Sequence, residues 1–224
     1  MRKIVTILAA IFCMATQSVA SWAQKVESDP LVRTITMNTG LPSNAVRNIV
    51  QDENGFIWFG TDNGLCRYDG YSVQTFYNPA MSFDQYVSAL EDYDEGLLVG
   101  TVKGAYLFDF ATEQFKKLDD KINSTVYHFS LDGDRNVWIS TAEQGLFRYN
   151  LNTHESRNYK IKGSKGNVAC TLVDVNNQVW ALCNTAGSTL QRLNKSNDTF
   201  YPFRLKGDAT QLNGMAMLAN SDGS

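Results

Sequence analysis

The chain has 224 residues, of which 43% are hydrophobic and 19% are charged, and its formal net charge is −3. This length and apolar content are enough for a sizeable buried core. No run of Lys or Arg follows the first three residues, so the composition argues against a nucleic-acid partner for this segment.

The N-terminal residues have the pattern of a secretory signal peptide, which we place at residues 1–23. Arg2 and Lys3 precede an apolar stretch of about a dozen residues, and the small residues Ala20 and Ala23 offer cleavage sites. The stretch is shorter than the ~20 residues of a membrane-spanning helix, so a retained anchor is the weaker alternative. Removal of Arg2 and Lys3 leaves 18 basic and 23 acidic residues in a chain that we expect outside the cytoplasm.

Residues 24–43 come next and contain one predicted strand, Leu31–Met37. Four copies of one sequence pattern follow, at residues 44–83, 84–122, 123–164 and 165–206, and residues 207–224 begin a fifth. One position, which we call the anchor, is Trp58, Leu98, Trp138 and Trp180 in the four copies. Its spacing of 40, 40 and 42 residues is typical of repeat folds.

Each copy has the signals of four antiparallel strands. In the first copy, a β-rich triplet centred on Trp58 follows the turn residues Asn54–Gly55 and precedes a second turn at Asp62–Gly64. The segment GLCRYD, a polar turn and an aromatic-bearing strand complete the copy. The final strands end at Phe76, Phe115, Tyr159 and Phe200.

A four-stranded unit of this length cannot bury both of its faces alone, so neighbouring units must stack. Stacking about an axis predicts an all-β fold, a β-propeller of four-stranded antiparallel blades with the anchor residues packed between blades. We expect a truncated propeller of about four and a half blades, in which the N-terminal strand lacks its partners. A solenoid of β-units is the competing architecture.

The first copy, LPSNAVRNIVQDENGFIWFGTDNGLCRYDGYSVQTFY, resembles the two-component regulator propeller repeat of periplasmic sensor regions in hybrid histidine kinases. The residues that carry the resemblance are Leu41–Asn44, Asp52, Gly55, Trp58, Gly60–Thr61, Gly64–Leu65 and Arg67–Asp69. The third copy keeps most of them. The second copy departs from the pattern at Leu98, and the fourth has Leu182–Cys183 in place of Gly–Thr. The resemblance covers residues 35–224.

The resemblance implies the N-terminal sensor region of a hybrid two-component system histidine kinase/response regulator, on the periplasmic side of a bacterial inner membrane. It further implies a soluble ligand, often derived from a polysaccharide, and a phosphorelay that controls transcription. Membrane attachment, kinase activity and a homodimer would all come from sequence outside this segment. The alternatives are a secreted or periplasmic propeller scaffold for protein interaction and, third, a propeller lyase or glycosidase.

We expect the segment itself to bind rather than to catalyse, and we assign it no catalytic residue, metal or cofactor. His128 in an apolar strand and His154 in a polar turn are too isolated for a metal site or a catalytic triad, and His128 is expected to pack in the core. Carboxylates recur at matching turn positions, where we expect them to cap turns: Asp52, Asp62, Asp69, Asp109, Asp132 and Asp174.

Cys170 and Cys183 suggest one disulfide hypothesis. If the hairpin between them turns at Asn176–Asn177, they form a directly opposed pair about 4.5 Å apart between Cα atoms, within disulfide range. An extracytoplasmic compartment permits the bond, and two buried free thiols are the alternative. Cys66 is expected to be a small core residue.

A ligand is expected at one mouth of the propeller channel, lined by loops between blades and by the turns between second and third strands. The candidate residues are Asn44, Asp62, Asn63, Tyr86, Lys103, Glu143, Gln144 and Asn184. This mixed polar set suits a hydroxyl-rich or charged ligand. For each residue, a solvated turn is the alternative.

Overall fold

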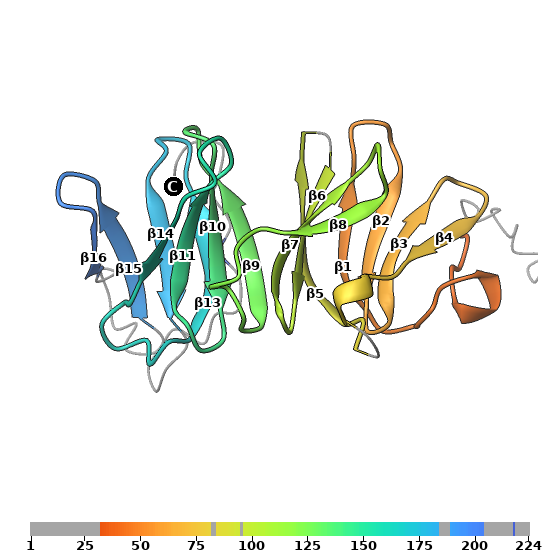
Figure 1. Cartoon of the computed structure of the whole chain (residues 1–224), viewed down its shortest axis with the longest axis horizontal. Coiled ribbons are helices and arrows are strands. Elements are labelled where there is room, and N and C mark those ends of the chain that lie inside the picture. The colour runs from red at the N-terminus through yellow and green to blue at the C-terminus, as the bar shows by residue number, and fades with distance from the viewer. Residues whose placement is uncertain (1–31, 82–83, 95, 184–188, 204–216, 218–224) are drawn as a thin grey trace, which may run out of the picture. The chain divides into compact units, whose positions relative to one another are not determined.

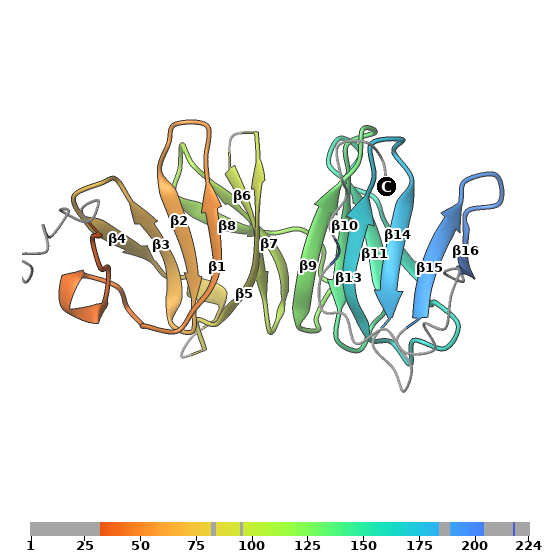
Figure 2. The same ribbon diagram turned by 180° about the vertical axis from the view of Figure 1, so that it is seen from behind.

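The computed structural model describes residues 32–81, 84–94, 96–183, 189–203 and 217. Across these residues, sixteen strands form four antiparallel sheets of four, and the only helices are the short 3-10 turns η2 (Met37–Thr39) and η3 (Pro79–Met81). Figures 1 and 2 show the sheets from opposite sides. The predicted all-β class with four-stranded antiparallel blades is confirmed, and we call the sheets blades 1 to 4.

Each blade is built from one continuous stretch of chain, with its strands in sequence order. Blade 1 contains β1 (Val46–Gln51), β2 (Ile57–Thr61), β3 (Gly64–Tyr68) and β4 (Val73–Phe76). Blade 2 contains β5 (Val87–Tyr93), β6 (Gly96–Thr101), β7 (Gly104–Asp109) and β8 (Gln114–Lys117). Blade 3 contains β9 (Val126–Leu131), β10 (Asn136–Thr141), β11 (Leu146–Asn150) and β12 (Ser156–Tyr159). Blade 4 contains β13 (Val168–Val173), β14 (Val179–Cys183), β15 (Thr189–Asn194) and β16 (Thr199–Pro202).

An aspartate organises the turn between the first and second strands of blades 1, 3 and 4. In blade 1, Oδ1 of Asp52 accepts the backbone N–H groups of Asn54 and Phe56, at 2.9 and 3.0 Å. Its Oδ2 accepts the indole Nε1–H of Trp58 at 2.8 Å. The same indole bond joins Trp138 to Asp132 and Trp180 to Asp174, each at 2.9 Å. The predicted capping role of these three carboxylates is confirmed, and they hold the anchor indoles as well.

The threonine that ends the second strand closes the next turn in blades 1 to 3. The hydroxyl groups of Thr61, Thr101 and Thr141 donate to the carbonyl oxygens of Gly64, Gly104 and Gly145, at 2.9, 3.0 and 2.7 Å. These turns carry several of the candidate ligand residues. The hydroxyl bonds therefore fix the backbone from which those side chains extend.

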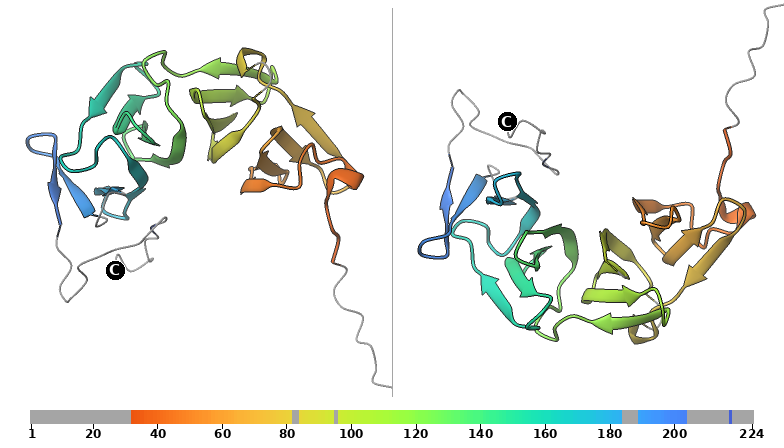
Figure 3. Two further views of the ribbon diagram at one scale, coloured as in Figure 1. Left: turned by 90° about the horizontal axis from the view of Figure 1, so that it is seen from below. Right: turned by 90° about the horizontal axis from the view of Figure 1, so that it is seen from above.

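Consecutive blades lie side by side (Figure 3). The anchor residues belong to the hydrophobic clusters between them. The Trp58 indole, 1% exposed, contacts the Phe108 ring of blade 2, with centroids 5.5 Å apart, and shares a buried cluster with Leu97 and Val99. The fully buried anchor of blade 2, Leu98, shares a buried cluster with residues of β9 and β10, and Trp138 shares one with residues of β13 and β14. All three anchor side chains are buried. The fourth anchor, Trp180, is only partly buried.

The hypothesis of a disulfide between Cys170 and Cys183 is wrong in this structure, where both thiols are free and buried. The turn after β13 spans five residues, because Val173 pairs with Val179, rather than the two that the hypothesis assumed. A β-bulge between Val168 and Cys170 then shifts the register. Cys170 consequently lies opposite Leu182, and Cys183 lies opposite Val168.

The segments before and after the blades depart from expectation or fall outside the described residues. The predicted strand Leu31–Met37 is not formed in its described part: residues 32–36 are irregular and Met37 begins η2. The physical reason is that no described strand pairs with it, and an isolated strand has no hydrogen-bonded ladder. The predicted signal peptide, and the fifth copy apart from Met217, lie outside the described residues. Among the described residues, no helix is long and apolar enough to cross a membrane.

Candidate functional site

Two of the predicted ligand residues, Asp62 and Tyr86, are brought together by an arginine that the sequence analysis did not select. Arg47 on β1 binds Asp62 through both ends of its guanidinium group, with Nε–Oδ1 at 2.7 Å and Nη2–Oδ2 at 3.0 Å. The same guanidinium lies 5.7 Å from the ring centroid of Tyr86. The hydrogen bond from Arg47 lowers the pKa of Asp62. The three side chains therefore connect the turn of blade 1 with the start of blade 2.

Asn44 and Asn63 hold the segment that leads into blade 1. The Asn44 side-chain oxygen accepts the backbone N–H of Met37 at 2.8 Å, and the Asn63 amide donates to the carbonyl of Pro42 at 3.5 Å. Lys103 is exposed, and its backbone N–H donates to the Thr101 hydroxyl. Asn184 lies outside the described residues. The structure therefore gives Asn44 and Asn63 a structural use, and it leaves Lys103 as an exposed turn residue.

Glu143 and Gln144 lie in the wall of a cavity beside blade 3, which we call the blade 3 pocket. Its volume is about 680 Å³. The wall is formed by the β10–β11 turn, the end of β12, the connection to blade 4 and one residue that precedes blade 3. The lining residues are Lys121, Glu143, Gln144, Gly145, Phe147, Asn158, Lys160, Ile161, Ser164, Lys165 and Gly166.

Hydrogen bonds fix the polar part of this wall. The Gln144 side chain accepts the backbone N–H of Asn123 and donates to the carbonyl of Lys121, both at 2.9 Å. The Asn158 amide donates to the Gln144 carbonyl at 2.8 Å. A Cβ atom at Gly166 would overlap the backbone of Glu143, so only glycine fits where the two loops meet. The two amides and the two loops of this wall are thus preorganised.

The chemistry of the blade 3 pocket suits a polar ligand that carries negative charge. Three exposed lysines, Lys121, Lys160 and Lys165, and one carboxylate, Glu143, stand around the amides of Gln144 and Asn158. Sequence reasoning selected the turn residues Glu143 and Gln144 from their repeat position. It missed the lysines, because they come from connections outside the repeat pattern.

Within the part of the chain that the structure describes, neither histidine lies in a cluster of catalytic groups. His128 on β9 is partly buried, its Nδ1 atom has no hydrogen-bond partner, and burial lowers its pKa. His154 lies in the outer turn of blade 3, where its Nδ1 is 3.0 Å from the Tyr149 hydroxyl. Cys66 is fully buried, and burial raises the pKa of its thiol to about 11. Among the described residues, no group of three His, Cys, Asp or Glu side chains is placed to hold a metal ion.

Comparison with known proteins gives a family match on the first copy. Residues 40–63 match the model described as two component regulator propeller. Histidine kinase P4 of Formosa agariphila is 27% identical over 132 residues, which is 53% of this chain and 9% of that protein. This chain therefore spans only a small part of the relative. The resemblance inferred from the sequence is confirmed at the repeat itself.

Solved structures share the fold. The extracellular domain of a hybrid two component system from B. thetaiotaomicron has a TM-score of 0.65 and 23% identity, over 77% of this chain and 23% of that one. A catalytically inactive virginiamycin B lyase from Staphylococcus aureus has a TM-score of 0.61 and 13% identity, over 75% of this chain and 58% of that one. At these identities the likeness shows the propeller fold alone.

Proposed function

We propose that this chain is the extracytoplasmic ligand-sensing portion of a membrane-bound two-component regulator. The observation that carries the proposal is the match of residues 40–63 to the two component regulator propeller model. The fold shared with the extracellular domain of a hybrid two component system supports the same placement, on the periplasmic side of the membrane. In this role the segment binds a ligand and performs no catalysis, and a kinase elsewhere in the protein converts binding into transcription of target genes.

The proposed ligand is an oligosaccharide with acidic groups, and the proposed site is the blade 3 pocket. The volume of about 680 Å³ is within the range of small-ligand sites. Amides such as Gln144 and Asn158 match the hydroxyl groups of a sugar, and Lys160 and Lys165 match a carboxylate or sulfate. The partly apolar wall at Phe147 and Ile161 suits the apolar face of a sugar ring.

The test is a titration of the full chain with a neutral glucan oligomer, a galacturonate oligomer and a sulfated galactan oligomer, followed by calorimetry. We expect an acidic oligomer to bind, and we expect Lys165→Ala to weaken its binding by about tenfold through the loss of a charge-assisted contact. Lys103→Ala removes an exposed lysine from the β6–β7 turn of blade 2, outside the pocket lining, and is the control. If no oligomer binds, the proposed ligand is refuted. If Lys165→Ala and Lys103→Ala weaken binding equally, the proposed site is refuted.

A further inference from the structure

An arginine on the third strand lies directly opposite the anchor indole in three of the four blades. The pairs are Arg67 opposite Trp58, Arg148 opposite Trp138 and Arg192 opposite Trp180. Each guanidinium stacks over its indole, at 5.6, 5.8 and 5.5 Å from the ring centroid. Such stacking keeps the guanidinium at the face that meets the next blade. In blade 2, both positions are leucine, Leu98 opposite Leu107.

In two cases the arginine forms an ion pair with a carboxylate of the next blade. The carboxylate lies in the outer turn, the turn between the third and fourth strands. Arg67 pairs with Glu113 of blade 2, with Nη1–Oε1 at 3.6 Å. Arg148 pairs with Asp198 of blade 4, with Nη1–Oδ1 at 3.4 Å. Glu113 and Asp198 hold the same place in their turns and the same left-handed backbone, with φ of 54° and 52°.

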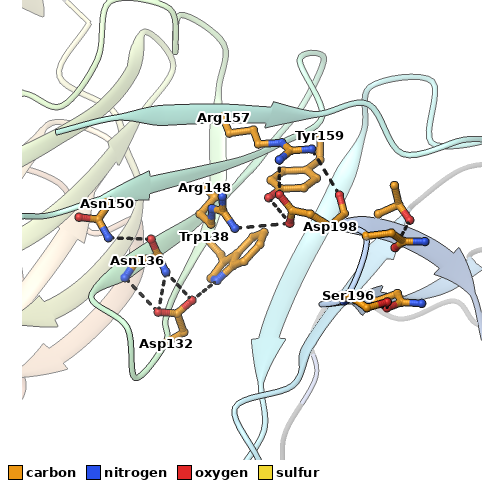
Figure 4. A network of polar contacts seen from close by, with 12 residues as sticks. Asp132, Asn136, Trp138, Arg148, Asn150, Arg157, Tyr159, Ser196 and Asp198 are labelled. Atoms are coloured by element: carbon orange, nitrogen blue, oxygen red, sulfur yellow. Dashed lines mark hydrogen bonds and ion pairs between the residues drawn. The ribbon is translucent and has the colours of Figure 1, made fainter. Parts of the chain in front are cut away.

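The carboxylate of Asp198 binds further side chains of blade 3 besides Arg148 (Figure 4). Its Oδ1 also accepts the Tyr159 hydroxyl at 2.7 Å, and its Oδ2 accepts the Arg157 guanidinium. Both partners come from β12 of blade 3. One acidic side chain of blade 4 therefore joins three side chains of the preceding blade.

The interface between blades 2 and 3 lacks both partners, the arginine and the acid at the left-handed position. It supports a pairing rule, in which an arginine on the third strand of one blade occurs together with an acid at the left-handed position of the next blade's outer turn. Blade 2 presents Leu107 where the other blades present arginine, and blade 3 presents His154 at the left-handed position, with φ of 58°. His154 contacts Tyr149 of its own blade instead of reaching back. At all three described interfaces, the left-handed position of the outer turn carries an acid where the preceding blade carries arginine, and carries none where it does not. Glu155, the acid of the blade 3 outer turn, stands one residue after that position.

The corresponding arginine of blade 4 has no carboxylate partner from a following blade within the described residues. Arg192 forms no ion pair there, and the carboxylate it influences electrostatically, Asp174, belongs to its own blade. The Trp180 indole beneath it is partly exposed, and Phe203, 40% exposed, meets that indole edge-on at 5.0 Å. A cavity of about 470 Å³ lies beside these side chains.

We infer that the Trp180–Arg192 face is a docking surface for a further blade of the same repeat, one that carries Asp or Glu at the left-handed position of its outer turn. Charge complementarity selects this occupant, since the other two arginines of this kind, Arg67 and Arg148, each meet such an acid. Blade 1 of a second copy does not fit. Its outer turn has Gly70 at the left-handed position, and Asp69 is used by the turn itself, accepting the N–H groups of Tyr71 and Ser72.

The pairing rule is tested in the full chain by installing the missing pair between blades 2 and 3. Leu107→Arg, His154→Glu and the double variant are compared by urea denaturation. We expect the two changes together to lower the unfolding equilibrium constant by about threefold relative to the product of the single effects, because the new pair is partly exposed. Additive effects would overturn the rule, whatever the result of the second experiment.

The docking surface is tested by extending the full chain, after Ser224, with a copy of its own residues 179–203, which would complete a blade carrying Asp198 in its outer turn. Trp22→Phe in the chain and Trp180→Phe in the copy leave Trp58, Trp138 and Trp180 as the indoles. Because Trp58 and Trp138 are each 1% exposed, acrylamide quenching reports mainly on Trp180. We expect the extension to reduce this quenching by about twofold as the indole is covered.

Matched charge variants separate the inferred pairing from nonspecific coverage. Asp198→Lys in the copy should restore the quenching of the unextended chain, and Arg192→Glu in the chain should then recover the protection. Equal protection with either charge in the copy would overturn the inference.

Discussion

The aspartate six residues before each anchor tryptophan both caps a turn and binds the indole N–H. In blade 3, Asp132 accepts the backbone N–H groups of Asp134 and Asn136, and its second oxygen accepts the indole N–H of Trp138. The sequence predicts the turn-capping half of this role, since Asp before a turn is a local pattern. The indole bond was not predicted, because it depends on the direction of a side chain on the neighbouring strand.

We expect Asp132→Asn to lower the free energy of unfolding by about 2 kcal/mol, because an amide cannot accept hydrogen bonds from both the turn and the indole at both of its ends. Asp134→Asn is the control, since Asp134 is exposed and its carboxylate makes one long contact, at 3.4 Å with Asn177. Urea denaturation of both variants decides the question. Equal stability of the two would show that the indole bond contributes nothing net.

Blade 2 shows what happens when the indole is missing. Asp92 stands six residues before Leu98, and one of its carboxylate oxygens is buried without a partner. Burial and the charges of Asp52 and Glu53 raise its pKa. The departure at Leu98 could be read from the sequence, but its electrostatic result could not, because Asp52 and Glu53 belong to the neighbouring blade.

At the scale of strands and turns, a small residue two positions after the anchor of blades 1 to 3 lets neighbouring blades approach closely. A Cβ atom built on Gly100 would lie 2.8 Å from the Ala89 Cβ and 2.9 Å from the Val126 Cγ1, which belongs to blade 3. The sequence shows a glycine here in blades 1 and 2. Its reason became visible only with the packing of β6 against β9.

We therefore expect Gly100→Ala to destabilise the chain by about 1 to 3 kcal/mol through overpacking of this contact. Ser140→Ala is the control at the same position of blade 3, where a Cβ atom is already present. The measurement is the midpoint of thermal unfolding. A Gly100→Ala variant as stable as Ser140→Ala would mean that β6 and β9 separate at no cost.

Turn length limited the prediction in blade 4. Asn176–Asn177 was interpreted as a two-residue turn, but Asp174 makes a longer one by accepting the N–H groups of Asn176 and Gln178. The same residue types serve both turn lengths, so composition alone could not decide between them. Because the real turn is longer and a β-bulge shifts the register, Cys170 does not lie opposite Cys183. The disulfide hypothesis, which assumed the shorter turn, is therefore wrong.

At the scale of the whole molecule, what could be predicted depended on distance along the chain. The strands and the stacking of blades followed from a local repeat, as Trp58 and Trp138 illustrate. The candidate site was predictable only in part: Glu143 and Gln144 share a repeat position, whereas Lys165 belongs to a connection. Contacts such as that of Arg148 with Asp198 join residues of different copies, so they required the packed structure.

The interior of the stacked blades also holds a carboxyl group that should make stability depend on pH. Burial, assisted by the charge of Asp92, raises the pKa of Glu91 from 4.5 to about 7. The folded chain then binds this proton more tightly than the unfolded chain does, so stability is lost as the pH rises from about 4.5 through 7. We expect the loss to be about 2 kcal/mol, since the partly buried carboxyl group is screened by solvent.

Glu91→Gln should remove this part of the pH dependence. The variant should match the parent near pH 4 and exceed its stability near pH 8 by about 2 kcal/mol, as measured by urea denaturation at each pH. Glu155→Gln changes an exposed carboxylate in an outer turn and is the control. The expectation fails if both variants follow the parent across the whole range.

Each blade is one uninterrupted stretch of polypeptide, and this affects how the protein acquires its structure during synthesis. Backbone pairing within a blade joins residues that are close in sequence, and low contact order favours rapid folding. We expect β1 to β4 to pair while later residues are still being translated, and each new sheet to be templated by its predecessor. Hydrogen-exchange labelling of ribosome-bound chains would measure this order, and simultaneous protection of all four sheets would contradict it.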